Sequence, residues 1–241
     1  MKRILLMFLR NLLFCPYWFY QLCVYGREND RHTEEERFAL LKKMVIKANK
    51  SGRVTIEATG LENLPQKDGF IMFPNHQGLY DALAFIESSS HPFSVVVKKE
   101  VRNIPFLKQV FSVMRVKAID REDIKKAMKV ILDVAKEVGE GRNYIIFAEG
   151  TRSKKGNQVQ NFKGGTFKSA IKAKCPILPA AIIDAFKPFD TNSIKPVTVQ
   201  IHYLPPLYYE DYKEMKSTEI AALVKDRIES AICENMPVDD I

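Results

Sequence analysis

The stretch "EDIKKAMKVILDVAKEVGEGRNYIIFAEG", residues 122–150, places an amphipathic segment directly before a short apolar one. In the first part, apolar residues recur every three or four positions, which predicts a helix ending at Gly139 or Gly141. The run "NYIIFA" that follows is almost wholly apolar, as in a buried strand. A helix followed at once by a buried strand is typical of α/β proteins.

The same alternation continues on both sides of this stretch. We predict further helices at 104–114, 163–174 and 217–236, and strands at 53–60, 69–75, 92–99, 115–121, 143–150, 176–183 and 195–204. This order predicts an α/β fold with a mainly parallel or mixed sheet flanked by helices. We assign residues 53–241 to this one domain, because no long linker or internal repeat interrupts them.

Composition and charge narrow the class of protein. The 241 residues are 46% hydrophobic and 27% charged, which is typical of a folded globular protein. The net charge of +8 suits an anionic partner such as a membrane surface or a phosphorylated substrate. We expect no nucleic acid partner, because the basic residues form no aromatic-studded motif. Four scattered cysteines without a CxxC pair indicate reduced thiols in a cytosolic compartment.

The N-terminal segment "MKRILLMFLRNLLFCPYWFYQLCVYGR", residues 1–27, is apolar and aromatic with a few basic residues. A cleaved signal peptide would need a small-residue cleavage site, and none follows Val24. A spanning helix needs about 20 apolar residues, and Arg10 and Pro16 interrupt this run. We therefore favour a helix, a break at Pro16 and a second helix, both lying in the membrane interface, over a helix pair buried in the core.

A third helix is predicted to connect this segment to the domain. Thr33 and Glu36 form a capping box, and Gly52 ends the apolar periodicity. Residues 1–52 would thus form a membrane-associating segment with its connecting helix. The predicted location is the cell membrane, with peripheral or monotopic attachment on the cytoplasmic side.

Polar residues follow several predicted strands. His76 follows strand 69–75, Arg121 ends strand 115–121, and Glu149, Thr151 and Arg152 follow the apolar run 143–148. In open α/β sheets, ligand sites form beyond the carboxyl ends of the strands. We therefore predict that these residues gather at one edge of the sheet.

The stretch "FPNHQGLYDAL", residues 73–83, contains a candidate proton-transfer pair, His76 and Asp81. A neutral imidazole accepts a proton near pH 7, and a carboxylate on its other nitrogen fixes the tautomer. No GxSxG motif occurs, so the base would activate a hydroxyl of the substrate. Taken alone, the pair is more typical of a structural histidine beside a capping aspartate.

The pair belongs to a series of four motifs, namely "NHQGLYD", "AIDRED", "FAEGTRS" and "CPILPAAI". This series resembles the glycerolipid acyltransferase family, specifically its 1-acylglycerol-3-phosphate acyltransferases, over roughly residues 55–205. The resemblance implies that His76 deprotonates the acceptor hydroxyl and Asp81 orients His76, and that the hydroxyl attacks an acyl thioester. It also implies a glycerol phosphate site made of Arg121, Glu149, Gly150, Thr151 and Arg152.

The chemistry of these residues suits a phosphate. Arginine binds phosphate bidentately, and a glycine such as Gly150 allows close backbone approach. Lys163, at a helix start with Gly164 and Gly165, adds donors for an anion. Lys98 ends a strand near the site and either binds phosphate or the acyl carrier, or belongs to a solvated face. Glu149 is alternatively a structural partner of Arg152.

The implied reaction moves an acyl chain from acyl-CoA or acyl-ACP to the 2-hydroxyl of lysophosphatidic acid, giving phosphatidic acid in phospholipid biosynthesis. Two alternatives stay open. One is an acyltransferase for glycerol 3-phosphate or another lysophospholipid, and the other is a non-catalytic, membrane-bound lipid-binding protein. We expect no metal or cofactor beyond the thioester co-substrate.

The chain departs from the family pattern at three positions. Ala148 replaces the usual proline of the third motif. Lys108 and Arg115 stand where the family usually carries glycines. We expect the acyl pocket or the acceptor surface to differ near these two cations.

Overall fold

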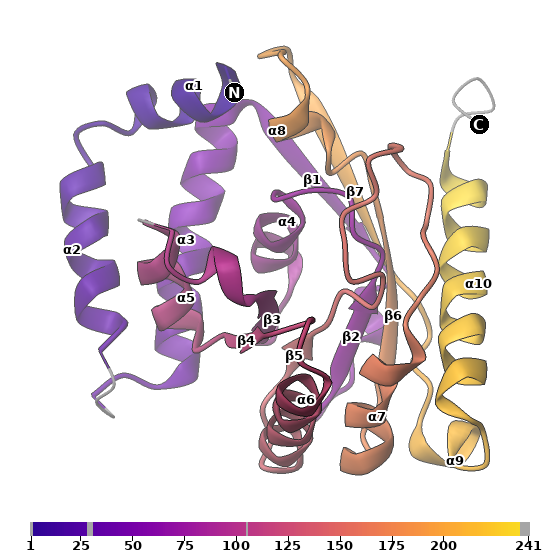
Figure 1. Cartoon of the computed structure of the whole chain (residues 1–241). Coiled ribbons are helices and arrows are strands. Elements are labelled where there is room, and N and C mark those ends of the chain that lie inside the picture. Colours follow the sequence, from indigo (N-terminus) through magenta and orange to yellow (C-terminus); the bar gives the residue numbers. More distant parts are fainter. Residues whose placement is uncertain (1, 28–30, 105, 237–241) are drawn as a thin grey trace.

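The structure is a computed structural model that describes residues 2–27, 31–104 and 106–236. The parts of predicted segments at positions 1, 28–30, 105 and 237–241 lie outside the described residues. The described residues form one seven-stranded sheet in the order β1-β7-β6-β2-β5-β3-β4. Helices cover both faces of this sheet (Figure 1). The predicted class, an α/β fold with a sheet flanked by helices, is confirmed.

All seven predicted strands are present, with shorter ends. They are β1 Val54–Thr59, β2 Ile71–Pro74, β3 Ser94–Lys98, β4 Lys117–Ile119, β5 Tyr144–Ile145, β6 Ile177–Ile183 and β7 Val197–Tyr203. Neighbouring strands from β6 to β4 are parallel, whereas β7 is antiparallel to β6 and parallel to β1. The sheet is therefore mixed, with a run of five parallel strands.

The helices form two layers. On one face lie α3 Glu34–Gly52, α4 Asp81–Ser88 and α5 Leu107–Met114, and on the other lie α6 Ile124–Gly139, α7 Gly164–Ala173 and α10 Ser217–Asn235. Helix α4 is absent from the sequence prediction. The short helices are η1 Leu61–Asn63, η2 Lys99–Val101, α8 Lys187–Asp190 and α9 Tyr209–Tyr212. The capping box of α3 is confirmed, since Thr33 Oγ1 accepts from the amide of Glu36 at 3.2 Å.

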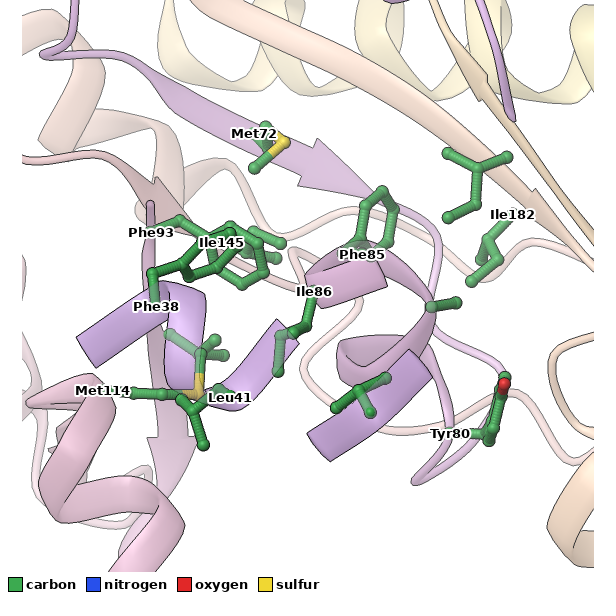
Figure 2. Close-up of a cluster of buried hydrophobic side chains, with 14 of the residues drawn as sticks. Phe38, Leu41, Met72, Tyr80, Phe85, Ile86, Phe93, Met114, Ile145 and Ile182 are labelled. Atoms are coloured by element: carbon green, nitrogen blue, oxygen red, sulfur yellow. The ribbon is translucent and has the colours of Figure 1, made fainter. Parts of the chain in front are cut away.

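The core consists of one apolar cluster on each face of the sheet. Successive side chains of a strand point to opposite faces, so β2 serves both clusters. Met72 packs with Phe38, Leu41 and Phe85 toward α3 and α4 (Figure 2). Phe73 packs toward the other layer, where its ring stacks on Phe167 with centroids 4.1 Å apart. Burial on both faces explains the continuous apolar run of β2.

The N-terminal segment forms α1 Lys2–Arg10 and α2 Cys15–Tyr25, as predicted. The break precedes Pro16, which lies in the first turn of α2, where the missing N–H is tolerated. Arg3 is buried and donates to the carbonyl oxygens of Gly52 at 2.5 Å and Lys195 at 2.7 Å. Arg10 donates to the carbonyl of Ser51 at 3.0 Å. The basic face of α1 therefore binds the C-terminal end of α3, where unpaired carbonyls and the helix dipole favour cations.

The opposite face of α1 and much of α2 are exposed and apolar. Met7 and Leu22 are the buried hydrophobic side chains of these two helices in the described part of the chain. The alternative of a helix pair buried in the core is therefore wrong. Across residues 2–27, 31–104 and 106–236, none of the helices combines the length and apolar character needed to cross a bilayer.

Candidate active site

The parallel strands bring the predicted polar residues to one edge of the sheet. His76 follows β2, Glu149 follows the neighbouring β5, Lys98 ends β3, and Arg121 follows β4. Since strands lie about 4.8 Å apart, the β4 end is roughly 14 Å from the β2 end. The four strand ends thus form a row, with His76 and Glu149 close together and Arg121 at the far end.

The carboxylate of Asp81 organises the turn that holds His76. Asp81 is the first residue of α4, and its Oδ2 lies 2.7 Å from His76 Nδ1. The same carboxylate accepts from the amides of Gln77 at 2.7 Å and Gly78 at 2.9 Å. Its side chain is 1% exposed, whereas that of His76 is 19% exposed. Burying this charge is tolerable because donors surround it.

This contact assigns the protonation of the imidazole ring. A carboxylate accepts hydrogen bonds, so Nδ1 carries the proton and Nε2 keeps its lone pair. The Phe147 ring stacks on the imidazole, with centroids 4.2 Å apart and an interplanar angle of 26°. The ring is thus held at one edge and on one face, and Nε2 is available as a base. Phe147 was not predicted as a site residue. The one sequence feature that could have indicated it is its place in the motif "FAEGTRS".

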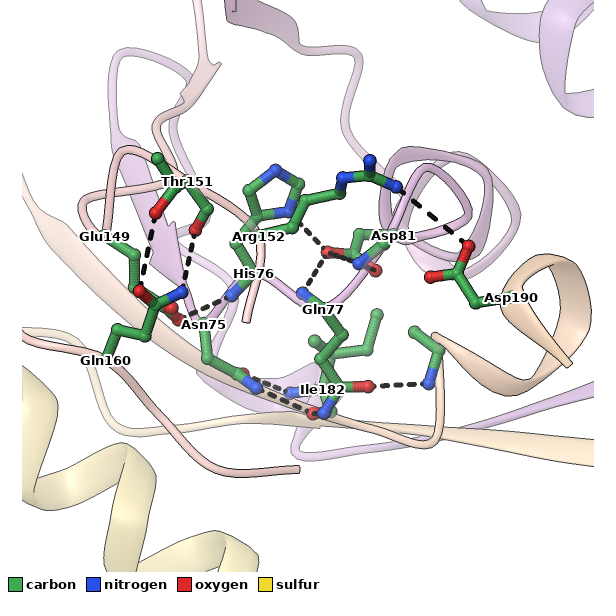
Figure 3. Close-up of polar contacts among 12 residues, drawn as sticks. Asn75, His76, Gln77, Asp81, Glu149, Thr151, Arg152, Gln160, Ile182 and Asp190 are labelled. Atoms are coloured by element: carbon green, nitrogen blue, oxygen red, sulfur yellow. Dashed lines mark hydrogen bonds and ion pairs between the residues drawn. The ribbon is translucent and has the colours of Figure 1, made fainter. Parts of the chain in front are cut away.

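The loop after β5 holds the backbone of His76. Glu149 Oε1 accepts from the His76 amide at 2.7 Å (Figure 3). The Ser153 amide donates to the His76 carbonyl at 2.7 Å. Glu149 is buried, and this burial raises the pKa of its carboxyl group. The alternative that Glu149 pairs with Arg152 is wrong. The Glu149 carboxylate accepts hydrogen bonds from backbone amides, among them that of the residue carrying the base.

Gly150 and Lys163 come into close contact. Gly150 has a φ of +77°, and a Cβ there would lie 2.8 Å from Lys163 Nζ. Lys163 directly precedes α7, and its amide donates to the carbonyl of Ala148 at 2.8 Å. A glycine at 150 therefore allows both the backbone conformation and the passage of the lysine side chain. The ammonium group of Lys163 lies beside the loop that binds His76.

Arg152 and Thr151 are exposed on this loop. Arg152 Nη1 lies 4.0 Å from Asp190 Oδ1 of α8, and its side chain is 41% exposed. A Cβ placed on Gly78 would lie 3.4 Å from Asp190 Oδ2, so this pair stands next to the His76–Asp81 turn. Thr151 contacts Gln160, whose Nε2 donates to the Thr151 carbonyl at 3.2 Å. Asp190 was not predicted, and no motif marks it.

Lys98 and Arg121 lie at the other end of the row. Both are exposed, and Lys98 pairs with Glu100 at 3.4 Å. The adjacent Lys99 binds Asp120 at 2.8 Å, which joins the end of β3 to the end of β4. No hydrogen bond or ion pair among the described residues links Lys98 or Arg121 to His76. The structure therefore groups His76, Asp81, Glu149, Gly150, Thr151, Arg152 and Lys163, and sets Lys98 and Arg121 apart.

Two further polar residues tie the His76 turn to β6. Asn75 exchanges hydrogen bonds with the backbone of Ile182, at 2.9 and 2.8 Å. Gln77 donates to the Ile182 carbonyl at 2.8 Å and accepts from the Ala185 amide at 2.7 Å. Sequence reasoning missed both, although polar residues flanking His76 after an apolar strand were a usable signal. The turn is bound on both sides, by the loop after β5 and by β6.

A fixed imidazole beside exposed basic side chains, at the carboxyl edge of a parallel sheet, is an arrangement that can take a proton from a substrate carrying an anionic group. Comparison with known proteins gives the family. Residues 55–183 match the Acyltransferase family model, so the chain belongs to the acyltransferase family.

Relatives and a solved structure agree with this assignment. The chain is 32% identical over 177 residues to a 1-acyl-sn-glycerol-3-phosphate acyltransferase of Borreliella burgdorferi, covering 73% of this chain and 70% of that protein. It is 32% identical over 165 residues to the enzyme of that name from Escherichia coli K12, covering 68% and 67%. The fold resembles the crystal structure of the LPA acyltransferase PlsC from Thermotoga maritima, with a TM-score of 0.72. The match covers 95% of this chain and 97% of that chain, at 21% sequence identity.

The geometry of His76 predicts a large effect on acyl transfer. We expect His76→Ala to lower turnover by about 100- to 10,000-fold, the usual range for a lost general base. Asp81→Asn should also be severely impaired, because the imidazole loses its tautomer and orientation. Turnover and circular dichroism measured on both variants check this. A well-folded His76→Ala protein with near-wild-type turnover would contradict the assignment.

Glu149 is expected to act as a hydrogen-bond acceptor whose charge is dispensable. Because burial raises the pKa of the Glu149 carboxyl group, the folded protein binds the carboxyl proton more tightly than the unfolded chain does. The contribution of Glu149 to the free energy of unfolding therefore falls as the pH rises past 4.5. Glu149→Gln should therefore be at least as stable at pH 7 and keep activity within about threefold, whereas Glu149→Ala should lose roughly 100-fold as His76 shifts. Turnover and thermal unfolding are compared with the exposed control Glu62→Ala. Equal losses in the Gln and Ala variants would show that the charge itself is required.

Proposed function

We propose that this protein moves a fatty acyl chain from an acyl thioester to the 2-hydroxyl of 1-acylglycerol 3-phosphate, giving phosphatidic acid for phospholipid biosynthesis. The observation that carries the proposal is the His76 ring, whose Nδ1 is bound by Asp81 at 2.7 Å while Nε2 keeps its lone pair. The relatives named for this activity support it. Arg152 and Lys163 place positive charge beside the base, as an acceptor with a phosphate requires.

The chemistry follows from the position of the base. Nε2 of His76 takes the proton of the acceptor hydroxyl. At the same time, the hydroxyl oxygen attacks the carbonyl carbon of the thioester. The tetrahedral intermediate then collapses, the C–S bond breaks, and the proton passes from the imidazolium to the leaving thiolate. Asp81 stabilises the imidazolium throughout and does not itself take the proton.

The pairing of Arg152 suits exchange with a phosphate. Its contact with Asp190 is long, at 4.0 Å, and lies at the surface, where ion pairs contribute about 0–1 kcal/mol. Hydrogen bonds to charged groups contribute about 1.5–3 kcal/mol, and a phosphate offers arginine two at once. An acceptor phosphate therefore displaces Asp190 from Arg152. Arg121 and Lys98 would bind the acceptor from the far end of the row.

The acyl donor is either acyl-CoA or acyl-ACP. A carrier-thiol release assay with lysophosphatidic acid, glycerol 3-phosphate, a lysophospholipid and no acceptor tests the proposed function. Release that depends on lysophosphatidic acid is the expected result. Release with glycerol 3-phosphate or another lysophospholipid alone would favour the alternative acceptors, and no release with any acceptor would favour a non-catalytic lipid-binding protein.

The exposed face of α1 and α2 supports attachment in the membrane interface. The turn between the helices presents Leu12, Leu13 and Phe14, and Leu13 is 91% exposed. The face extends through these side chains: Ile4, Leu5, Phe8, Leu9, Tyr17, Phe19 and Tyr20. An apolar patch of this kind marks an interaction site, and aromatic residues favour the headgroup level. We assign attachment to residues 1–52 and chemistry to residues 53–241, with the protein on the cytoplasmic side of the cell membrane.

Acceptor specificity is expected to depend on Arg152 and Arg121. Losing a charge-assisted contact of about 1.5–3 kcal/mol should lower kcat/KM for lysophosphatidic acid by roughly tenfold to a hundredfold in each alanine variant. Lysine at either position should restore kcat/KM only partly, because it lacks the planar guanidinium group that binds two phosphate oxygens at once. Assays with lysophosphatidic acid and a monoacylglycerol decide the point. Equal proportional losses on the two acceptors would mean that the arginines do not bind the phosphate.

Membrane binding should depend on the apolar face. The double variant Leu9→Ser, Leu13→Ser should weaken binding to neutral vesicles by about 10- to 100-fold, because two leucine side chains lose their apolar environment. Ile124→Ser is the matched control, since Ile124 is 81% exposed on α6. Vesicle co-sedimentation measures all three proteins. Equal binding of the double variant and the control, or release of the wild type by salt alone, would contradict interfacial anchoring.

A further inference from the structure

A second concave site lies at the free edge of the sheet, along β4. It is a cleft of about 900 Å³ between α5, β4 and α6, with contributions from the ends of α2 and α3. Six cationic side chains line it: Arg37, Arg102, Lys108, Arg115, Lys117 and Arg142. Glu137 is the one carboxylate among the described lining residues. The cleft therefore carries a large excess of positive charge, which focuses the field on an anion.

Four of the six cationic side chains of the cleft fall into two groups. Lys117 and Arg142 both pair with Glu137, and Arg142 also binds Glu34 at 3.0 Å, so these charges hold the walls together. Arg102 and Lys108 are exposed and form no hydrogen bond or ion pair through their side chains in the described part of the chain. These two cations are available to a ligand.

Two of the cations of the cleft, Lys108 and Arg115, come from α5 and its C-terminal cap, and both line the same wall. Arg115 has a φ of +51°, in the left-handed region that favours glycine. A cation is thus present at a position where its backbone conformation is unfavourable. Arg53 and Lys174 are likewise cationic C-caps with positive φ, so the conformation alone assigns no role to Arg115, whose side chain adds charge to the cleft.

The remaining lining suits a nucleotide. Phe111 offers an aromatic surface, and Asn103 and Ser112 offer hydrogen-bonding groups. A volume of about 900 Å³ matches a small-molecule site, whereas a carrier protein would dock on a broader surface. The chemistry that fits is a phosphorylated nucleoside.

A continuous segment connects the cleft with the catalytic edge. Arg102 and Asn103 follow η2, which begins directly after Lys98 at the carboxyl end of β3. Lys99 of the same segment binds Asp120 beside Arg121. A ligand held in the cleft can therefore extend a flexible arm along this segment toward the strand ends.

We propose that this cleft binds the phosphorylated adenosine end of a coenzyme A thioester, with Arg102, Lys108 and Arg115 contacting its phosphates. The inference rests on the proposed acyl transfer and makes coenzyme A, not acyl carrier protein, the donor of this enzyme. The site is distinct from the acceptor phosphate site at Arg152.

Calorimetry with adenosine 3′,5′-bisphosphate tests the cleft without relying on catalysis. The wild type should bind it, and Arg102→Gln, Lys108→Gln should weaken binding by about tenfold or more, since each lost charged contact counts for roughly a factor of ten. Lys172→Gln, which removes an exposed lysine of α7 outside the cleft, should bind like the wild type. Absence of binding by the wild type, or equal binding by the double variant, would overturn the proposal.

Kinetics separate the donor from the acceptor. The double variant should raise KM for acyl-CoA by about tenfold or more and leave KM for lysophosphatidic acid within about twofold. Arg115→Gly should raise KM for acyl-CoA while its Tm stays equal or rises, because glycine relieves the left-handed conformation. An unchanged KM for acyl-CoA in both variants, or activity with acyl-ACP alone, would overturn the proposal and leave acyl transfer standing. Bisphosphate binding without thiol release would instead refute the proposed function.

Discussion

The buried carboxylate of Asp81 is the interaction on which the site depends. A carboxylate away from water is costly unless donors surround it, and Asp81 is bound by one imidazole and two backbone amides. Its position at the start of α4 adds the favourable end of the helix dipole. These requirements fix the turn from His76 to Asp81 and therefore the direction of the ring. Glu149 and Ser153 then hold the backbone of His76 from the neighbouring strand end.

The same constraint explains how α1 is attached to the domain. Arg3 is buried, and its guanidinium group is satisfied by carbonyl oxygens at the end of α3 and before β7. With its basic side directed inward, α1 presents its apolar side to the surroundings. Sequence analysis identified a few basic residues in this segment, but it did not show that Arg3 and Arg10 bind the end of α3. The partners are carbonyl groups remote in sequence, which leave no side-chain signal.

Sequence patterns predicted the strands well and their arrangement less well. Apolar runs identified strands such as β2 and β6, which are buried on both faces. The order of strands and the antiparallel pairing of β7 with β6 depend on long-range contacts that periodicity does not encode. Helix α4 was missed because its eight residues follow directly on the His76 turn and leave little room for a periodic pattern. The site residues were found through motifs, whereas Asp190 lies at the end of the four-residue helix α8 and belongs to no motif.

The C-terminal end of α5 combines a left-handed backbone conformation with a charged side chain. Glycine at a helix C-cap is favoured for its left-handed conformation, and arginine at 115 loses that advantage. Its carbonyl still accepts from Ser94 Oγ at 3.1 Å, so the turn itself is preserved. The backbone therefore keeps the geometry that glycine would give, while the side chain adds a charge to the cleft. Lys108, near the other end of α5, lines the same wall, so the two side chains together raise the positive charge of the cleft.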